Sequence, residues 1–209
     1  EAMPAPWIPL IGDNPIQVGE ETGFEDTFSG QLDALGAEVG GWVRAPLPVD
    51  NPIMGVQSWL QNFHLDHKGV RFVGLDWNSR EIGTAWGELP DLHDFSGGTL
   101  PFLVDALETL PDGPRDRVIL LSHMPLVPGL MLDEQADFLA AVEPWRGAIW
   151  GQHAGHLHGN GEATWEEAGF EIRTTDATWD DVNTYRLVEV WSDGVSFTYV
   201  DELIEVPDE

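Results

Sequence analysis

A continuous apolar run ends in a histidine at Val118-Ile119-Leu120-Leu121-Ser122-His123. A run without polar alternation is typical of a strand that is buried on both faces, as the strands of α/β sheets are. His123 then lies at the carboxyl edge of that strand, where open α/β sheets place their ligands. The run therefore predicts an α/β sheet with His123 at its ligand-binding edge.

Strand-like and helix-like segments flank this run on both sides. Apolar residues at three- and four-residue spacing, such as Leu100, Leu103, Val104 and Leu107, predict helices. Eight predicted strands imply one large sheet or two, and the last strands follow one another without helices. We therefore predict one domain over residues 1–209, an α/β sandwich of two mixed sheets flanked by helices, with a peripheral acidic end at 201–209. The predicted strands cover 7–11, 62–66, 70–77, 117–123, 148–153, 170–174, 185–191 and 195–200, the helices 24–35, 99–110 and 132–142, and the long loops 45–52 and 78–98.

Composition excludes several classes of partner. The chain has 209 residues, 42% of them hydrophobic, which suits a globular domain with a sizeable core. Acidic residues outnumber basic ones by 37 to 9, and Lys68 is the single lysine, so we expect no nucleic-acid binding and no attraction to anionic membranes. No apolar run approaches the roughly 18 residues of a membrane helix, so no membrane insertion is expected. Cysteine is absent, so a metal site must use His, Asp, Glu or Asn.

The net charge of −28 predicts a dependence of stability on salt. It indicates a solvated acidic surface of the halophilic kind, and a field that concentrates divalent cations near a metal site is compatible with it. Salt screens charges over about 10 Å at 0.1 M and should relieve their repulsion. We expect the melting temperature to climb as KCl is raised from low to molar concentration. A flat or falling curve in thermal unfolding would remove the halophilic interpretation.

A second histidine motif, Gly155-His156-Leu157-His158-Gly159, follows the apolar segment at 148–153. Two residues apart in extended backbone, the two imidazoles would point to the same side, and the glycines would let the chain turn closely around an ion. The simpler alternative is two surface histidines in a glycine-rich turn. Because His123 ends another strand, we expect the three imidazoles to converge and bind a metal ion.

Together with Gly12-Asp13-Asn14 and the strand that ends in Asp76, these motifs resemble the later motifs of the calcineurin-like metallophosphoesterases. The resemblance spans residues 6–200, and its most specific element is the Gly-His-x-His segment at 155–158. It implies a hydrolytic centre with two divalent ions, iron, manganese or zinc, and a small phosphate ester as substrate. The expected activity is that of a phosphomonoesterase or phosphodiesterase.

The resemblance also implies roles for individual residues. His123 and His156 would bind one ion and His158 the other, with Asp13 as a further ligand. Asn14 falls where the family has a histidine and can hydrogen-bond a phosphate oxygen, but it cannot donate a proton as an imidazolium does. A slip of one residue would instead make Asn14 the metal ligand.

The family's upstream Asp-x-His and Gly-Asp-x-x-Asp motifs are absent from this chain, so we expect a domain that is incomplete at its N-terminus. The rival hypothesis is a catalytically inactive binding or scaffold domain. The one Asp-x-His segment, at residues 91–93, follows a Leu-Pro pair and is expected to be a coincidence in a solvated loop. His64 and His67 are expected on the exposed face of a strand or hairpin. His153 is expected to pack or hydrogen-bond behind the site, and Asp76 to accept structural hydrogen bonds near it.

Overall fold

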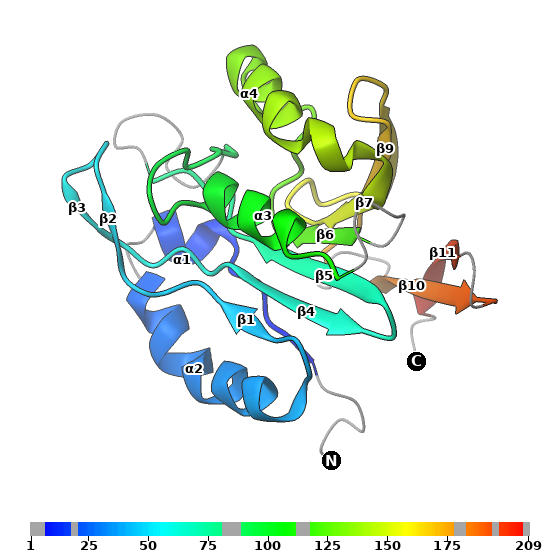
Figure 1. Ribbon diagram of the computed structural model, residues 1–209, viewed down its shortest axis with the longest axis horizontal. Coiled ribbons are helices and arrows are strands. Elements are labelled where there is room, and N and C mark those ends of the chain that lie inside the picture. The colour runs from blue at the N-terminus through cyan, green and yellow to red at the C-terminus, as the bar shows by residue number, and fades with distance from the viewer. Residues whose placement is uncertain are drawn as a thin grey trace.

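The computed structural model describes residues 7–17, 21–80, 89–111, 118–177, 183–193 and 197–206. A seven-stranded mixed sheet lies at its centre, in the order β1-β4-β5-β6-β7-β9-β8 (Figure 1). The start of the strand predicted at 117, the first two residues of the strand predicted at 195, and the middle of the loop predicted at 78–98 lie outside the described residues. The mixed sheet and its flanking helices confirm the α/β class.

The centre of the large sheet is parallel and its two margins are antiparallel. β5, β6, β7 and β9 run parallel to one another, whereas β1 and β4 on one side and β8 on the other run antiparallel to their neighbours. Parallel strands deliver their carboxyl ends to one edge, so the residues after β5, β6 and β7 meet there. The strands are β1 (Val43–Arg44), β4 (Phe63–His67), β5 (Val70–Leu75), β6 (Val118–Ser122), β7 (Ile149–Ala154), β8 (Gly161–Trp165) and β9 (Phe170–Thr174).

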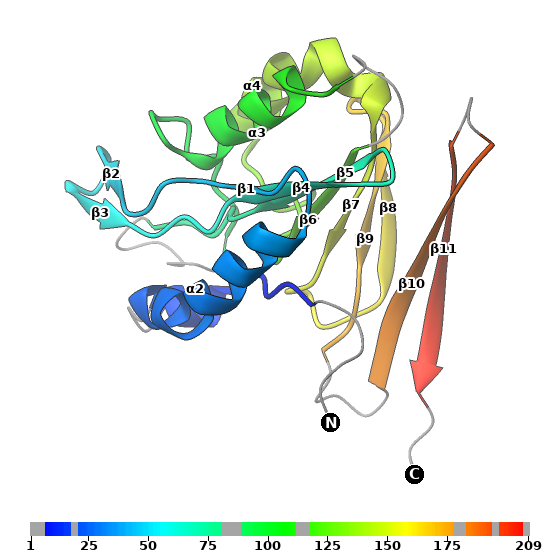
Figure 2. The same ribbon diagram turned by 60° about the horizontal axis from the view of Figure 1, so that its bottom comes forward.

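Helices cover both faces of this sheet (Figure 2). On one face lie α3 (Thr99–Glu108) and α4 (Leu132–Val142), which continues into the 3-10 helix η1 (Glu143–Ala148). On the other lie α1 (Asp13–Gln17) and α2 (Glu21–Glu38). The apolar stripes predicted for α3 and α4 form the main core, where Leu103 and Phe138 pack in one cluster with Leu120 of β6. Within the described residues, no helix has the length and apolarity needed to cross a bilayer.

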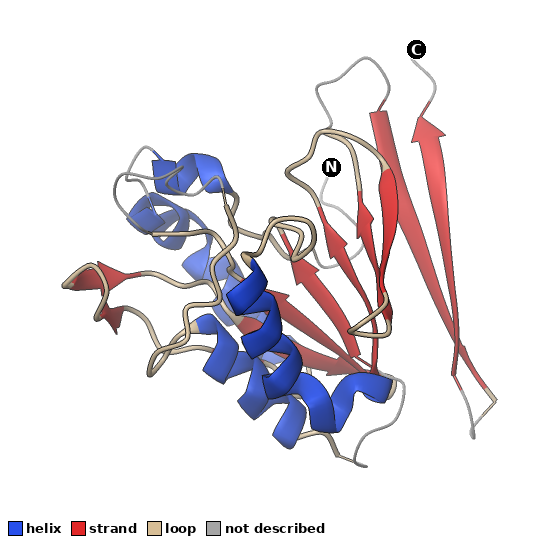
Figure 3. Ribbon diagram, turned by 90° about the horizontal axis from the view of Figure 1, so that it is seen from above, coloured by secondary structure: helices blue, strands red, loops and turns tan. Residues whose placement is uncertain are grey.

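Two smaller antiparallel pairs complete the fold. β2 (Val49–Asn51) and β3 (Val56–Ser58) form a short hairpin. β10 (Asn183–Ser192) and β11 (Phe197–Val206) form a long ribbon that runs beside the large sheet (Figure 3). The prediction of two mixed sheets needs correction in this respect, because β10 and β11 pair with each other over their whole length and no third described strand borders them.

A β-bulge in β7 determines which side chains face the ribbon. Val118 pairs with Ile149, but the next residue of β6 pairs with Gly151, so Trp150 is the extra residue. In a regular strand, residues three apart point to opposite faces. Because of the bulge, both Trp150 and His153 contact Tyr199 of β11.

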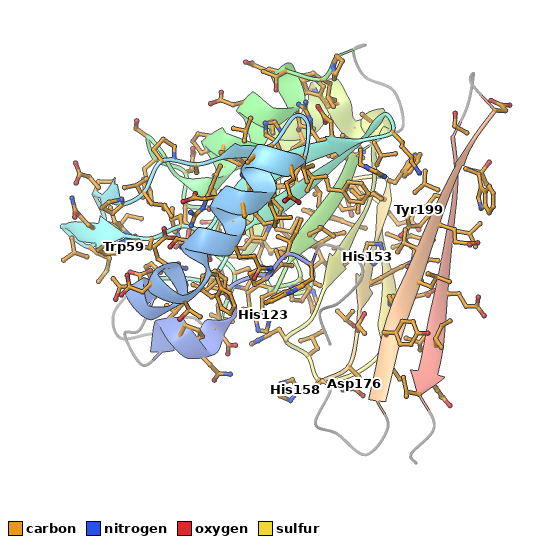
Figure 4. All side chains as sticks on the ribbon, turned by 90° about the horizontal axis from the view of Figure 1, so that it is seen from below. Trp59, His123, His153, His158, Asp176 and Tyr199 are labelled. Atoms are coloured by element: carbon orange, nitrogen blue, oxygen red, sulfur yellow. The ribbon has the colours of Figure 1, made fainter. Side chains whose placement is uncertain are left out.

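The ribbon is attached to the sheet by buried polar groups. This corrects the prediction of a peripheral end at 201–209 for Asp201, whereas Glu202, Leu203, Glu205 and Val206 are exposed as expected and 207–209 lie outside the described residues. The Asp201 carboxylate of β11, with 4% of its side chain exposed, lies 3.4 Å from Nε of Arg173 in β9 of the large sheet. Within the ribbon it also accepts a hydrogen bond of 2.8 Å from Arg186 of β10. The Tyr199 hydroxyl donates to Asp201 and accepts from His153. His153 and Tyr199 are labelled in Figure 4. Asp201 can therefore be buried, because Arg173 and Arg186 of neighbouring strands pair with its carboxylate.

Burial lowers the pKa of His153 to about 4, which predicts a loss of stability in acid. An unfolded histidine has a pKa of about 6.5. The contribution of neutral His153 is therefore complete above pH 6.5 and is lost as the pH falls toward 4. Between pH 7 and pH 4.5 the loss should be roughly 2–3 kcal/mol. In urea unfolding at constant salt, His153→Gln should lose less stability over this interval than the parent chain.

The matched control is His67→Gln, because His67 is exposed. Its stability should follow the parent chain at both pH values. If His153→Gln loses as much stability between pH 7 and pH 4.5 as the parent chain does, His153 is not held in its neutral form beside the ribbon.

Several sequence predictions of elements were wrong or incomplete. Residues 7–11 form no strand, because Pro9 lacks the backbone donor of a strand ladder and Ile11 instead packs with Ile16 and Phe24. β8 was not predicted, since Trp165 is its one buried residue and the three residues before it are exposed. The short elements α1, β1, β2 and β3 carry too few residues for a periodic signal.

Candidate metal centre

Asp13, His123 and His156 come together at the carboxyl edge of the large sheet. His123 follows β6 directly, as predicted, and its Nε2 donates a hydrogen bond of 2.9 Å to Oδ1 of Asp13. His156 follows β7 by one loop residue, and its Nδ1 lies 3.7 Å from Oδ2 of Asp13. One ligand atom from each of the three residues lies within 4.8 Å of the others. Among the described residues, this is the group of histidines and carboxylates that could hold a metal ion.

Neighbouring backbone holds His123 in this position. The Gly155 amide donates a hydrogen bond of 3.0 Å to the His123 carbonyl oxygen, which ties the loop after β7 to the end of β6. The imidazole packs over Gly12, where an added Cβ would lie 3.5 Å from the ring. Three segments that are distant in sequence therefore fix one imidazole.

The side chains of the site are only partly exposed, at 14% for Asp13, 25% for His123 and 22% for His156. Burial lowers the pKa of His123 below its ordinary value, and the neighbouring His156 acts in the same direction while Asp13 opposes both. The neutral imidazole is the form that binds metals. The site therefore presents His123 in its ligating form at neutral pH.

His158 does not join this group. Residues 156–159 bend, and the backbone at His156 and at His158 is left-handed, with φ of 66° and 46°. The expected extended segment with both imidazoles on one side is therefore wrong, because the turn is made by the histidines themselves and not by the flanking glycines. His156 is half-buried beside Asp13, whereas His158 is exposed and projects away from the protein (Figure 4).

Asn14 is exposed, one residue after Asp13 in α1. Successive residues of an α-helix, with 3.6 residues per turn, point in different directions. Asp13 contacts both imidazoles, so the structure favours Asp13 over Asn14 as the ligand from this turn. The role of Asn14 toward a phosphate oxygen stays a prediction.

Asp76, at the end of β5, accepts hydrogen bonds in a buried network beside this edge of the sheet. Its carboxylate is bound by Arg80 through two nitrogens, at 2.9 and 2.7 Å, and Arg80 also binds Glu21. The amides of Gln61 and Asn78 donate to the same carboxylate. Burial by itself would raise the pKa of Asp76, but the Arg80 guanidinium holds it below its ordinary value. Asp76 is thus a structural hydrogen-bond acceptor, as the sequence predicted, and the structure adds that Arg80 favours its charged form.

The sequence reasoning missed Arg80 and Glu21, which complete this network. The available signal was a basic residue four positions after a strand-terminal Asp76, a spacing that lets the two side chains meet across a tight turn. No local pattern points to Glu21, which comes from α2, 59 residues away from Arg80.

Two histidines were placed wrongly. His93 of the Asp-x-His segment is 1% exposed rather than solvated, because its Nε2 binds the carbonyl oxygen of Asn78 at 2.9 Å and Phe95 packs beside it. His64 is 7% exposed rather than on an open face, because α3 covers this part of the sheet with Phe102. His67 is exposed, as predicted.

The similarity found to known proteins lies among solved structures. No protein-family model and no curated protein match this chain. Among solved structures, it is similar to a dimetal phosphatase from Danio rerio, with 19% sequence identity, coverage of 93% of this chain and 81% of that chain, and a TM-score of 0.42. A likeness at this level does not establish a family.

Proposed function

We propose that this chain is a metal-dependent phosphoric ester hydrolase of the calcineurin-like kind, acting on a small phosphate ester. The observation that supports the proposal is the convergence of Asp13, His123 and His156 at the carboxyl edge of the sheet. In this proposal His158 serves a second ion, which needs ligands beyond the three that converge.

The donor set fits a divalent ion of the iron, manganese or zinc type. Two imidazoles and one carboxylate are ligands that these ions accept. Ligand bonds of about 2.0–2.2 Å put two donor atoms on one ion at most about 4.4 Å apart. The donor atoms here lie within 4.8 Å, so binding requires only a small inward movement. A bound divalent ion supplies Lewis-acid polarisation of a phosphoryl oxygen and lowers the pKa of a bound water.

The arginines of the described part of the chain are already paired with carboxylates. Each arginine among the described residues forms an ion pair with a carboxylate, so none is left to offset the charge of a phosphoryl group. In so acidic a protein, a divalent ion at the site would reverse the local sign and allow a phosphate to approach. These arginines are Arg44, Arg71, Arg80, Arg146, Arg173 and Arg186.

The rival function is a catalytically inactive, metal-binding domain. Asn14 favours it, because an amide cannot protonate a leaving group and the structure leaves this residue exposed. The three converging residues account for one ion, whereas phosphoryl transfer of this kind uses two ions about 3.5–4 Å apart.

We therefore expect the chain to bind one divalent ion tightly and to hydrolyse an aryl phosphate slowly, below about 1 s⁻¹, the lower end of ordinary turnover numbers. The assay measures release of the aryl alcohol from a monoester and from a diester, in molar KCl with added Mn²⁺ or Zn²⁺. The proposal predicts turnover that requires the added ion and disappears in His123→Ala, but persists in His67→Ala.

Binding of the ion with no turnover on either ester would favour the inactive domain. Turnover unaffected by His123→Ala would place the activity elsewhere. Two tight sites per chain, with turnover lost in His158→Ala, would show that this chain holds a complete two-ion centre.

A further inference from the structure

A cavity lies between the β1 margin of the sheet and α3, on the face opposite α2. Its volume is about 480 Å³, within the range of roughly 300–1,000 Å³ of small-molecule sites. Val43, Ala45 and Pro46 form one side, and Phe102 and Ala106 of α3 form the other. The cavity shares no residue with the candidate metal centre, so it is a separate feature of the molecule.

His64 of β4 also lines the cavity, together with the polar residues Arg44, Asp66, Arg71, Asp105 and Thr109. It is 7% exposed, and its Nδ1 is buried without a hydrogen-bond partner. Burial, with Arg71 nearby, lowers the pKa of His64 to about 4, so the imidazole is neutral at pH 7 and carries one donor and one acceptor nitrogen. An unsatisfied buried polar atom costs about 1–3 kcal/mol, and the broad ring torsion of histidine lets a nitrogen turn toward the cavity.

The charges of the cavity do not favour an ionic ligand. Arg71 is paired with Asp66 through two hydrogen bonds of 2.7 and 2.6 Å, and its remaining Nη1 binds the Ala106 carbonyl oxygen. Asp105 is exposed on α3, in contact with water. Arg44, which also lines the cavity, is paired with Glu25. An anion would therefore meet no unpaired arginine, and a cation would have to compete for carboxylates that are paired or hydrated.

The walls favour a flat molecule. The rings of His64 and Phe102 are 6.0 Å apart and inclined by 42°, so an aromatic ring can pack against both. A hydroxyl group both donates and accepts, and it can therefore pair with either nitrogen of a neutral imidazole.

We propose that this cavity is a binding site for a small uncharged aromatic alcohol, held by ring packing against Phe102 and by a hydrogen bond between its hydroxyl and His64. The proposal does not depend on the function of the metal centre. It concerns a ligand of the protein that contacts neither Asp13 nor the two histidines beside it.

The test uses the full chain with ¹⁵N-labelled histidine and two probes of similar size, phenol and toluene. Phenol should shift the His64 ring resonances saturably, with Kd of about millimolar for so few atoms. Toluene is the more apolar probe, so preference for phenol isolates the hydrogen bond. We expect toluene to bind about tenfold more weakly, which corresponds to about 1.4 kcal/mol.

Three variants control the assignment. His64→Phe keeps a ring but removes both nitrogens, so the preference for phenol should disappear in ligand-observed NMR. Val43→Trp changes a residue that is 45% exposed at the cavity and should block both probes. His67→Phe should bind phenol as the parent does. The proposal is wrong if phenol leaves the His64 resonances unmoved, if toluene binds equally well, or if Val43→Trp leaves phenol binding unchanged.

Discussion

Replacing Asp76 by alanine is expected to lower the free energy of unfolding by about 3–5 kcal/mol, the usual cost of removing one partner of a buried ion pair. Arg80, 3% exposed, would lose its two bonds to the carboxylate and keep Glu21 as its carboxylate partner. The amides of Gln61 and Asn78 would lose their acceptor as well. Typical domains have only about 5–15 kcal/mol of stability, so this change approaches the limit of folding.

Urea unfolding in molar KCl measures the effect, with Asp26→Ala as the control because Asp26 is an exposed acid on α2. Asp76→Asn keeps the shape and one acceptor oxygen, so it should be milder and remain folded if the alanine variant does not. Combining Asp76→Leu with Arg80→Met should cost less than the sum of the two single changes, because neither partner is then left buried alone. If the Asp76→Ala chain is as stable as the Asp26→Ala chain, the hydrogen-bond network around Asp76 contributes little to the free energy of unfolding.

The second large effect concerns metal affinity. His123→Ala and His156→Ala should each weaken binding of Zn²⁺ by more than about 100-fold, since loss of residues that merely orient ligands already costs about 10–100-fold. Asp13→Ala should act in the same direction, because its carboxylate contacts both imidazoles. Calorimetric titration of each variant measures the change.

His67→Ala is the control for a lost surface histidine. His158→Ala should leave the single tight site intact, because His158 lies outside the converging group. If His158→Ala weakens the tight site as much as His123→Ala does, His158 is a ligand of the tightly bound ion and the assignment of the ligands is wrong.

Local patterns were sufficient to place His123. An uninterrupted apolar run predicts a buried strand, and the polar residue that ends it must lie at the sheet edge. The contact between His123 and Asp13 spans 110 residues and depends on how α1 packs under the sheet, so only the family resemblance pointed to it. The left-handed backbone at His156 could not be predicted either. Gly155 and Gly159 flank the two histidines, and glycine adopts a left-handed conformation at a lower steric cost than histidine does.

Burial of polar residues was the least predictable property. His64 and His93 are polar and lie near charged residues in the sequence, which favours exposure. Both are nevertheless buried, because partners from distant segments cover them: Phe102 packs against His64, and the Asn78 carbonyl oxygen binds His93. Burial of this kind follows from tertiary packing, which a single sequence does not display.

The most direct test of the central claim is an anomalous diffraction measurement on crystals of the full chain grown with Mn²⁺ or Zn²⁺. The account predicts an anomalous peak within bonding distance, about 2.0–2.2 Å, of ligand atoms from Asp13, His123 and His156. The account would be contradicted by a strong peak elsewhere, with no ion within bonding distance of these three side chains.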